Sequence, residues 1–382
     1  MIPVARLQPP AVLFALIGLA GLALPLVQFK PNRIVPGEGV GLLALPQGLA
    51  ITGAVAVVLI AACAPRWPAA LRLAVAAAGL AGVILSLGAA AAHLVPPGNA
   101  LARVAPASGF WLLLLAFGLM GTDAVNRLKP GLALRWQMLA GALALAAAIL
   151  VSGALDGVSV MREYASRRDL FGREAQAHLA LAFGSLGLAL IVGIPAGIAI
   201  FQAPRLRGPV LGVLNILQTI PSLALFGIMI PVLGWVAATV PGAARAGVSG
   251  IGVFPALVAL FLYSLLPVVS NTLAGLSGVP AATRDAAIGL GMTRAQVLAQ
   301  VLVPLALPVL LAAVRIVLVQ NIGLAVIAGL IGGGGFGTFV FQGLNQTAMD
   351  LVLLGALPTI ALALVAGIAL DLLVQGARRV PA

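Results

Sequence analysis

Long apolar segments recur along the whole of this 382-residue chain, and they limit its possible folds more than any other feature. Leu, Val, Ile and Ala run for about 20 residues at a time with few charged side chains among them. A helix needs about that length to cross a bilayer core, because every backbone polar group must find its partner within the segment. The sequence therefore predicts an all-α integral membrane protein.

The composition supports this class and bears on possible partners. Hydrophobic residues make up 62% of the chain and charged residues only 8%, against about 25% charged residues in an average soluble domain. The net charge of +12 would suit nucleic acid, but on a membrane chain basic residues usually fix topology and meet anionic lipid head groups. We expect membrane lipid as a partner and no nucleic acid.

About ten transmembrane helices are expected from the apolar runs. They lie near residues 11–28, 47–64, 70–92, 108–123, 136–154, 177–201, 210–233, 251–272, 305–329 and 351–374. The first run lacks a small-x-small cleavage site, which favours an uncleaved span over a signal peptide.

A mixed-charge stretch divides the chain into two blocks. Residues 156–176 are expected to form an extracytoplasmic amphipathic linker between a block of about five spans, 1–155, and a second block, 177–376, followed by a tail, 377–382. The first block is rich in Ala, Leu and Gly, and small residues let transmembrane helices pack closely. We interpret it as a packing appendage that faces lipid or a partner.

Counting basic residues gives the orientation. With the N-terminus inside, twelve of the 21 Lys and Arg residues fall in inner loops and eight in outer loops. This distribution predicts cytoplasmic termini and a cytoplasmic location for the polar segment 277–304.

That polar segment is predicted to form two short helices joined at a glycine elbow. Gly291 suits the left-handed conformation that ends a helix. Thr293 and Gln296 have the spacing of a capping box at the start of the next helix, and Pro304 marks the point where that helix gives way to a span.

Polar and helix-breaking residues at membrane depth are concentrated in the second block. They are Gln218, Thr219, Pro221, Ser222, Tyr263, Asn271, Arg315, Gln320 and Asn321. Such groups either line a polar path or join helices by hydrogen bonds, and the sequence leaves both open. Arg315 falls near mid-span and needs a partner that the sequence does not identify, because Asp350 and Asp371, the acids that follow it, are expected near span ends.

Catalytic and cofactor sites are not expected in this chain. The glycines of Ile331–Gly337 follow an apolar span instead of a strand, and no Gly-Lys-Ser/Thr sequence is present, so we reject a phosphate-binding loop. Cys63 lies in apolar surroundings, while His93 and His178 are far apart and at span ends. We expect no metal site and no bound cofactor.

Segment 277–304 resembles the coupling loop of permease subunits of ATP-binding-cassette (ABC) importers, whose pattern is Glu-Ala-Ala, three residues, Gly, nine residues, Ile-x-Leu-Pro. Every spacing fits, with Asp in place of the Glu. The resemblance implies ATPase-coupling roles for Asp285, Ala286, Ala287, Gly291, Thr293, Val301, Val303 and Pro304.

Several flanking stretches narrow the resemblance to permeases of the osmoprotectant family, which import glycine betaine, carnitine and choline, in its subgroup with a long N-terminus. These stretches include QTIPSLALFGIMIPVLG, from Gln218, and LIGGGGFGTFVFQGL, from Leu330. The resemblance implies a type I ABC importer (MetI-like) permease core in the bacterial inner membrane. It also implies a binding protein, periplasmic or tethered, a second permease copy or paralogue, and two ATPase subunits that hold ATP and Mg.

Three other functions remain as alternatives. A permease for another small solute, such as an amino acid, would carry the same coupling loop. An ion-coupled carrier would need acids within the membrane, whereas most of the nine acids lie in predicted loops. An integral membrane enzyme would need a cluster of catalytic groups, which the sequence does not show.

Overall fold

The computed structural model describes residues 8–32, 35–64, 67–96, 98–99 and 101–379, which fall into two compact units, residues 1–166 and 167–382. Arg6, Arg33 and Arg66, which entered the orientation count, and the last three residues of the predicted tail lie outside the described residues.

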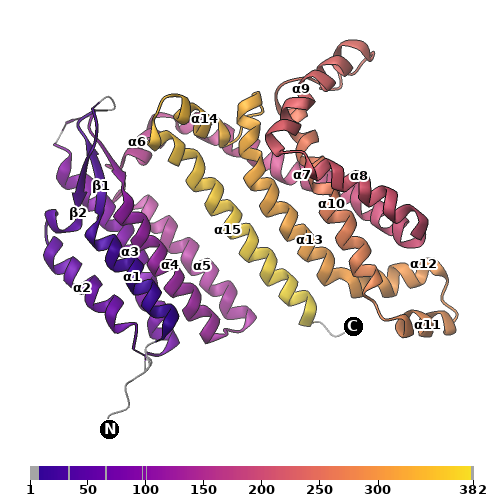
Figure 1. The fold of residues 1–382 in the computed structure, drawn as a ribbon, viewed down its shortest axis with the longest axis horizontal. Coiled ribbons are helices and arrows are strands. Elements are labelled where there is room, and N and C mark those ends of the chain that lie inside the picture. Colours follow the sequence, from indigo (N-terminus) through magenta and orange to yellow (C-terminus); the bar gives the residue numbers. More distant parts are fainter. Residues whose placement is uncertain (1–7, 33–34, 65–66, 97, 100, 380–382) are drawn as a thin grey trace, which may run out of the picture. The chain divides into compact units, whose positions relative to one another are not determined.

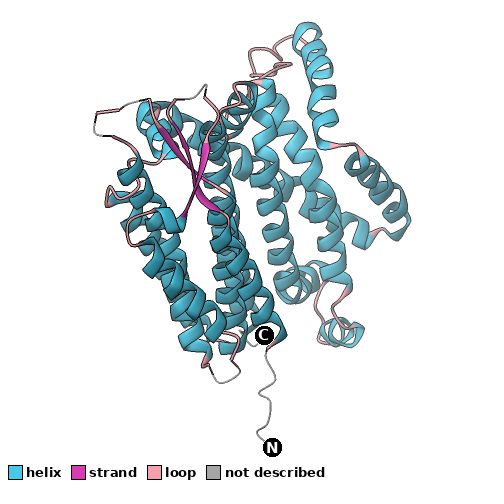
Figure 2. Cartoon of the chain, turned by 60° about the vertical axis from the view of Figure 1, so that its left-hand side comes forward, coloured by secondary structure: helices cyan, strands magenta, loops and turns pink. Residues whose placement is uncertain are grey.

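Within its described residues, the first unit combines six helices with a small sheet (Figures 1 and 2). Its helices are α1 Pro9–Ala23, α2 Gly48–Ala61, α3 Ala69–Leu94, α4 Ser108–Leu128, α5 Leu132–Val151 and α6 Ser159–Ser166, with a 3₁₀ turn at Leu42–Ala44. Its strands are β1 Pro25–Lys30, β2 Glu38–Gly41 and β3 Arg103–Pro106, in the antiparallel order β2-β1-β3.

The sheet corrects the all-α expectation in detail, although the fold remains helical. Val27 of β1 pairs with Val40 of β2 and with Pro106 of β3. The strands come from the α1–α2 and α3–α4 connections, which an up-and-down helix order brings to the same end of the unit. The strand β1 begins inside the predicted span 11–28, because α1 ends at Ala23 and Leu24, the residue before Pro25, is extended with ψ 159°.

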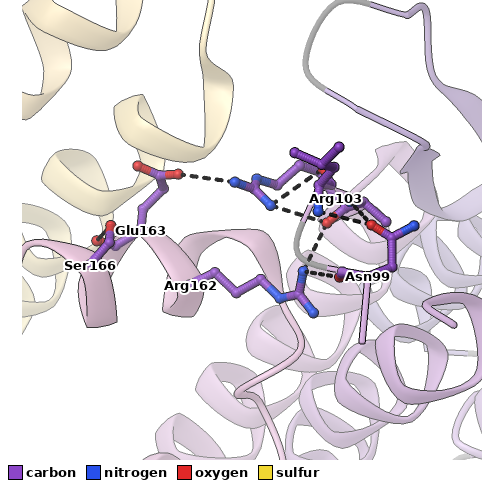
Figure 3. A network of polar contacts seen from close by, with 7 residues as sticks. Asn99, Arg103, Arg162, Glu163 and Ser166 are labelled. Carbon is purple, nitrogen blue, oxygen red and sulfur yellow. Dashed lines mark hydrogen bonds and ion pairs between the residues drawn. The ribbon is translucent and has the colours of Figure 1, made fainter. Parts of the chain in front are cut away.

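A polar network joins α6 to the segment around β3 within this unit (Figure 3). Arg162 donates from Nη1 to the carbonyl oxygens of Ala102, at 3.0 Å, and Asn99, at 3.2 Å. The guanidinium of Arg103 lies 3.9 Å from the buried carboxylate of Glu163. The predicted linker, residues 156–176, is therefore largely helical, since it contains α6 and the start of the helix Arg168–Gln202.

The second unit is a bundle of long helices with short connecting elements (Figure 1). Its helices are α7 Arg168–Gln202, α8 Arg207–Thr219, α9 Ser222–Thr239, α10 Val253–Ser277, α11 Ala281–Gly289, α12 Arg294–Gln296, α13 Val303–Leu324, α14 Gly337–Asn345 and α15 Met349–Arg379. Two 3₁₀ segments, Pro204–Leu206 and Ala325–Ile331, and a π-helical turn, Val297–Leu302, complete it.

The most extensive helix contact in this unit joins α7 and α10. A Cβ at Gly193 would lie 2.7 Å from Cγ1 of Val268, and one at Gly197 would lie 2.5 Å from Cβ of Thr272. These glycines let the two backbones approach closely, which is the common way for membrane helices to pack.

Eight described segments are long and apolar enough to cross a membrane, fewer than the ten predicted. The helices α1 and α2 have only 15 and 14 residues, about 21 to 22 Å at 1.5 Å per residue. The predicted span 210–233 is divided between α8 and α9. Proline disfavours helical geometry in the residue before it, and Ile220, before Pro221, is extended with ψ 125°.

Candidate functional site

The coupling loop, residues 277–304, contains a helix, a tight glycine turn and a second helical start. Gly291 has φ 82°, the left-handed conformation predicted for it. The N–H of Met292 donates to the carbonyl of Ala287 at 3.2 Å, and that of Gly291 donates to Ile288 at 2.9 Å. These two bonds form a Schellman motif, which closes the end of α11.

The predicted capping box opens the next helix. Thr293 N–H donates to Oε1 of Gln296 at 2.8 Å, and the Gln296 N–H donates to Oγ1 of Thr293 at 3.3 Å. The chain then runs through the π-helical turn into α13. α13 begins at Val303, one residue before Pro304, and continues directly from the π-helical turn, so the helix of the loop passes into the span there without a break.

One face of the coupling loop is buried and the other exposed. Its buried face is a small apolar cluster around Ala287, Val297 and Leu302, which also contacts Phe201 near the end of α7. The side chain of Asp285 is 68% exposed, and Leu290 is 84% exposed. Ile288, 53% exposed, adds a second apolar side chain near Leu290, and grouped exposed apolar side chains are typical of a protein-binding surface.

Several predicted path residues make hydrogen bonds within the unit. Gln218 and Tyr263 join the α8–α9 break to α10, since Gln218 Nε2 donates to the Tyr263 carbonyl at 2.8 Å and the Tyr263 hydroxyl donates to the carbonyl of Ile220. The hydroxyl of Thr219 and the amide of Asn271 each donate to a carbonyl of their own helix.

Asn321 belongs to a fully buried polar network that joins three helices. Its Nδ2 donates to Oγ of Ser185 on α7 at 2.8 Å, and its Oδ1 accepts from the hydroxyl of Ser264 on α10 at 3.0 Å. All three residues have no exposed surface. In this structure, Asn321 thus joins helices, which was the other interpretation that the sequence left open.

The remaining path candidates, Pro221, Ser222 and Gln320, lie at the surface or half-buried within the unit. The partner of Arg315 is Asp371 on α15, with Nη1 donating to Oδ1. Asp371 lies eight residues before the last residue of α15, so the helical rise brings it about 12 Å inside that helix.

A second cluster, missed by sequence reasoning, surrounds the glycine-rich turn at the other end of the unit. Glu174 on α7 accepts a hydrogen bond from the Thr338 hydroxyl at 3.2 Å, and one turn later Nδ1 of His178 accepts from the Phe336 N–H at 3.3 Å. A Cβ on Gly335 would lie 3.1 Å from that ring nitrogen. The i, i+4 spacing of Glu174 and His178 on α7 is the sequence signal that could have predicted this cluster.

Two family models match the chain. One, described as "Binding-protein-dependent transport system inner membrane component", covers residues 189–379, and the other, "ABC transporter permease YehY, N-terminal domain", covers residues 6–161.

Curated proteins and solved structures each resemble about half of this chain. The osmoprotectant import permease protein OsmW of Salmonella typhimurium is 43% identical over 188 residues, 49% of this chain and 82% of its own length. The carnitine transport permease protein OpuCB of Listeria monocytogenes is 38% identical over 193 residues, 50% of this chain and 81% of its own. An inward-facing MetNI methionine ABC transporter structure superposes with a TM-score of 0.47 at 25% identity, covering 55% of this chain and 96% of that one.

The match to the inner membrane component, residues 189–379, contains the coupling loop and most of the long helices of the second unit. The chain therefore belongs to the family of binding-protein-dependent transport system inner membrane components, the permease subunits of ABC importers.

Proposed function

We propose that this chain forms the membrane path of an ATP-driven importer for a small quaternary-amine solute of the glycine betaine, carnitine or choline type. The observation that carries the proposal is the coupling loop, whose buried apolar face fixes Asp285 and Leu290 in exposed positions. The 43% identity to an osmoprotectant import permease supports the solute class.

The division of labour follows from this role. Two ATPase subunits bind the coupling loop and hydrolyse ATP with Mg, a second permease subunit completes the path, and a binding protein on the far side delivers the solute. Residues 177–376 form the transport core, with 1–155 as an added membrane block and 156–176 as an extracytoplasmic connection. Gln218 and Tyr263 position the α8–α9 break beside the path.

An even number of predicted spans separates the coupling loop from each terminus, so a cytoplasmic loop places both termini in the cytoplasm. Within the second unit, Phe201 contacts the loop, so the α7–α8 connection with Arg205 and Arg207 lies at the same end. The glycine-rich turn and the α9–α10 connection meet at the opposite end, where the Gly252 N–H donates to the Ile331 carbonyl at 2.8 Å. Basic residues beside the coupling loop favour the cytoplasm for that end.

The test is uptake of labelled glycine betaine, carnitine, choline and methionine into proteoliposomes that contain the chain with its ATPase and binding protein. We expect uptake of at least one quaternary amine that requires ATP and the binding protein. Uptake without ATPase, driven by a proton or sodium gradient, would overturn the proposal, and uptake of methionine alone would overturn its solute class.

A further inference from the structure

An ion pair joins α13 to α15 in the transport core. Arg315 lies 12 residues beyond the start of α13, about 18 Å along the helix, and its guanidinium donates to Oδ1 of Asp371. The other carboxylate oxygen accepts from Nε2 of Gln375 at 2.7 Å. Both carboxylate oxygens of Asp371 therefore have partners, although the Arg315 and Asp371 side chains remain 39% and 41% exposed.

The helix that carries Arg315 continues directly from the coupling loop. The π-helical turn Val297–Leu302 leads into α13 without an extended residue, since Leu302 has φ −70° and ψ −47°. A displacement of the loop would therefore be carried along α13. Six residues beyond Arg315, the buried Asn321 network already fixes α13 to α7 and α10.

Contacts between α13 and α15 are otherwise aliphatic around the ion pair. Val317 and Leu318 belong to one apolar cluster with Leu362, Ala366 and Leu370. Such surfaces hold helices together but fix their relative register weakly, because side chains of similar shape can repack. A partly exposed ion pair adds little stability over apolar packing, whereas a single charged pair between two helices can specify one register.

We propose that Arg315, Asp371 and Gln375 form a brace that makes α15 follow α13 when the ATPases move the coupling loop. These are positioning residues, and the inference rests on the proposed function. The brace fixes the register of α15 against α13 more than it stabilises the fold.

The test separates coupling from folding by removing both charges. Arg315→Met with Asp371→Leu leaves no unpaired charge, so we expect normal insertion and an unchanged melting temperature. Uptake per ATP hydrolysed should fall about five-fold or more, while ATP hydrolysis persists. The exchanged pair, Arg315→Asp with Asp371→Arg, should recover a substantial part of the coupling.

The matched control is Arg127→Met with Asp123→Leu. That pair, with Nε and Oδ2 2.7 Å apart, is an i, i+4 pair within α4 and joins no two helices. It should leave uptake per ATP unchanged. A neutral Arg315–Asp371 variant with wild-type coupling would overturn the brace, whereas a wild-type complex that shows no ATP-dependent uptake would overturn the proposed function instead.

A distance measurement tests the brace without transport. Spin labels at Gln300 and Leu373, both exposed, in a Cys63→Ser background report on the spacing of the coupling segment and α15. In the ATPase complex, we expect the same distance distribution with and without a non-hydrolysable ATP analogue. In the neutral Arg315–Asp371 variant, the analogue should shift or broaden the distance distribution. The same response to the analogue in the wild-type and neutral proteins would contradict the brace.

Discussion

Gly291 is the residue on which the shape of the coupling loop depends most directly. A Cβ at this position would meet nothing within 4 Å, so a substitution costs only the strain of φ 82°. That strain is about 1–2 kcal/mol for a residue with a Cβ, and a β-branched residue is disfavoured further. We expect Gly291→Val to reach the membrane in normal amounts with solute uptake reduced several-fold.

Gly291→Asn is the control for this prediction, because Asn tolerates the left-handed conformation best among residues with a Cβ. It should retain most of the uptake. Uptake and membrane abundance are measured in the same cells, and equal uptake by the Val and Asn variants would show that the left-handed turn is not needed.

Replacing Asn321 tests how much the buried polar network contributes to stability. In Asn321→Ala, the hydroxyls of Ser185 and Ser264 keep the carbonyl acceptors Leu181 and Leu260, at 2.6 and 2.7 Å, so no hydroxyl is stranded. We expect a loss of about 1–2 kcal/mol from two hydrogen bonds and a small cavity, seen as a lower melting temperature in detergent.

Asn271→Ala is the matched control, since that amide donates to the Pro267 carbonyl of its own helix at 2.7 Å. It should lower the melting temperature less than Asn321→Ala does. The reverse order of the two variants would show that Asn321 does not join the three helices energetically.

Sequence rules predicted the conformation of single residues well where neighbouring residues determine that conformation. The left-handed Gly291 and the capping box of Thr293 and Gln296 depend on residues within one turn, and both are confirmed. The partner of Arg315 lies 56 residues away on another helix, so helical spacing could not identify it. The same holds for Ser185 and Asn321, which are 136 residues apart.

At the scale of elements, the α8–α9 break depends on one hydroxyl of the neighbouring helix. Tyr263 donates to the carbonyl of Ile220, which the extended geometry before Pro221 leaves without a helical partner. Tyr263→Phe should cost about 1 kcal/mol there, since a neutral hydrogen bond contributes that much. We expect amide hydrogens at the start of α9 to exchange about five-fold faster, as measured by mass spectrometry.

Thr219→Val serves as the comparison, because the Thr219 hydroxyl donates within α8 to Ile216 at 2.7 Å. Exchange at the start of α9 should stay at the wild-type rate in that variant. If Tyr263→Phe also leaves the rate unchanged, the break is held by Pro221 and the Gln218 amide alone.

Helices were predictable from the sequence where an apolar run and the polar or helix-breaking residues that end it agree, as in α10 and α15. The sheet was not, because four-residue strands such as β2 and β3 have no alternating pattern long enough to distinguish them from loops. The π-helical turn Val297–Leu302 also gave no local signal, and it joins the helix of the loop to α13 without a break.

At the scale of the whole molecule, each unit has its own core. The largest cluster of the first unit contains Leu59, Val83 and Phe117. The clusters of the second unit are built around α7, α10 and α13, with Leu260 and Val317 among their members. The family model of inner membrane components covers residues 189–379, which contain the coupling loop, and the curated relatives match this chain over about half of its length but over about four-fifths of their own.

The second unit should therefore transport without the first. A chain that starts at Arg167 behind a cleavable signal peptide keeps α7 in its orientation and retains the coupling loop, the Asn321 network and the Arg315–Asp371 pair. We expect it to form a complex with the ATPase and to retain ATP-dependent uptake within a few-fold of the full chain. The uptake assay compares it with the same chain carrying Gly291→Val, which should be impaired as in the full chain. A truncated chain that inserts and binds the ATPase but takes up no solute would show that the first unit contributes to the transport cycle itself.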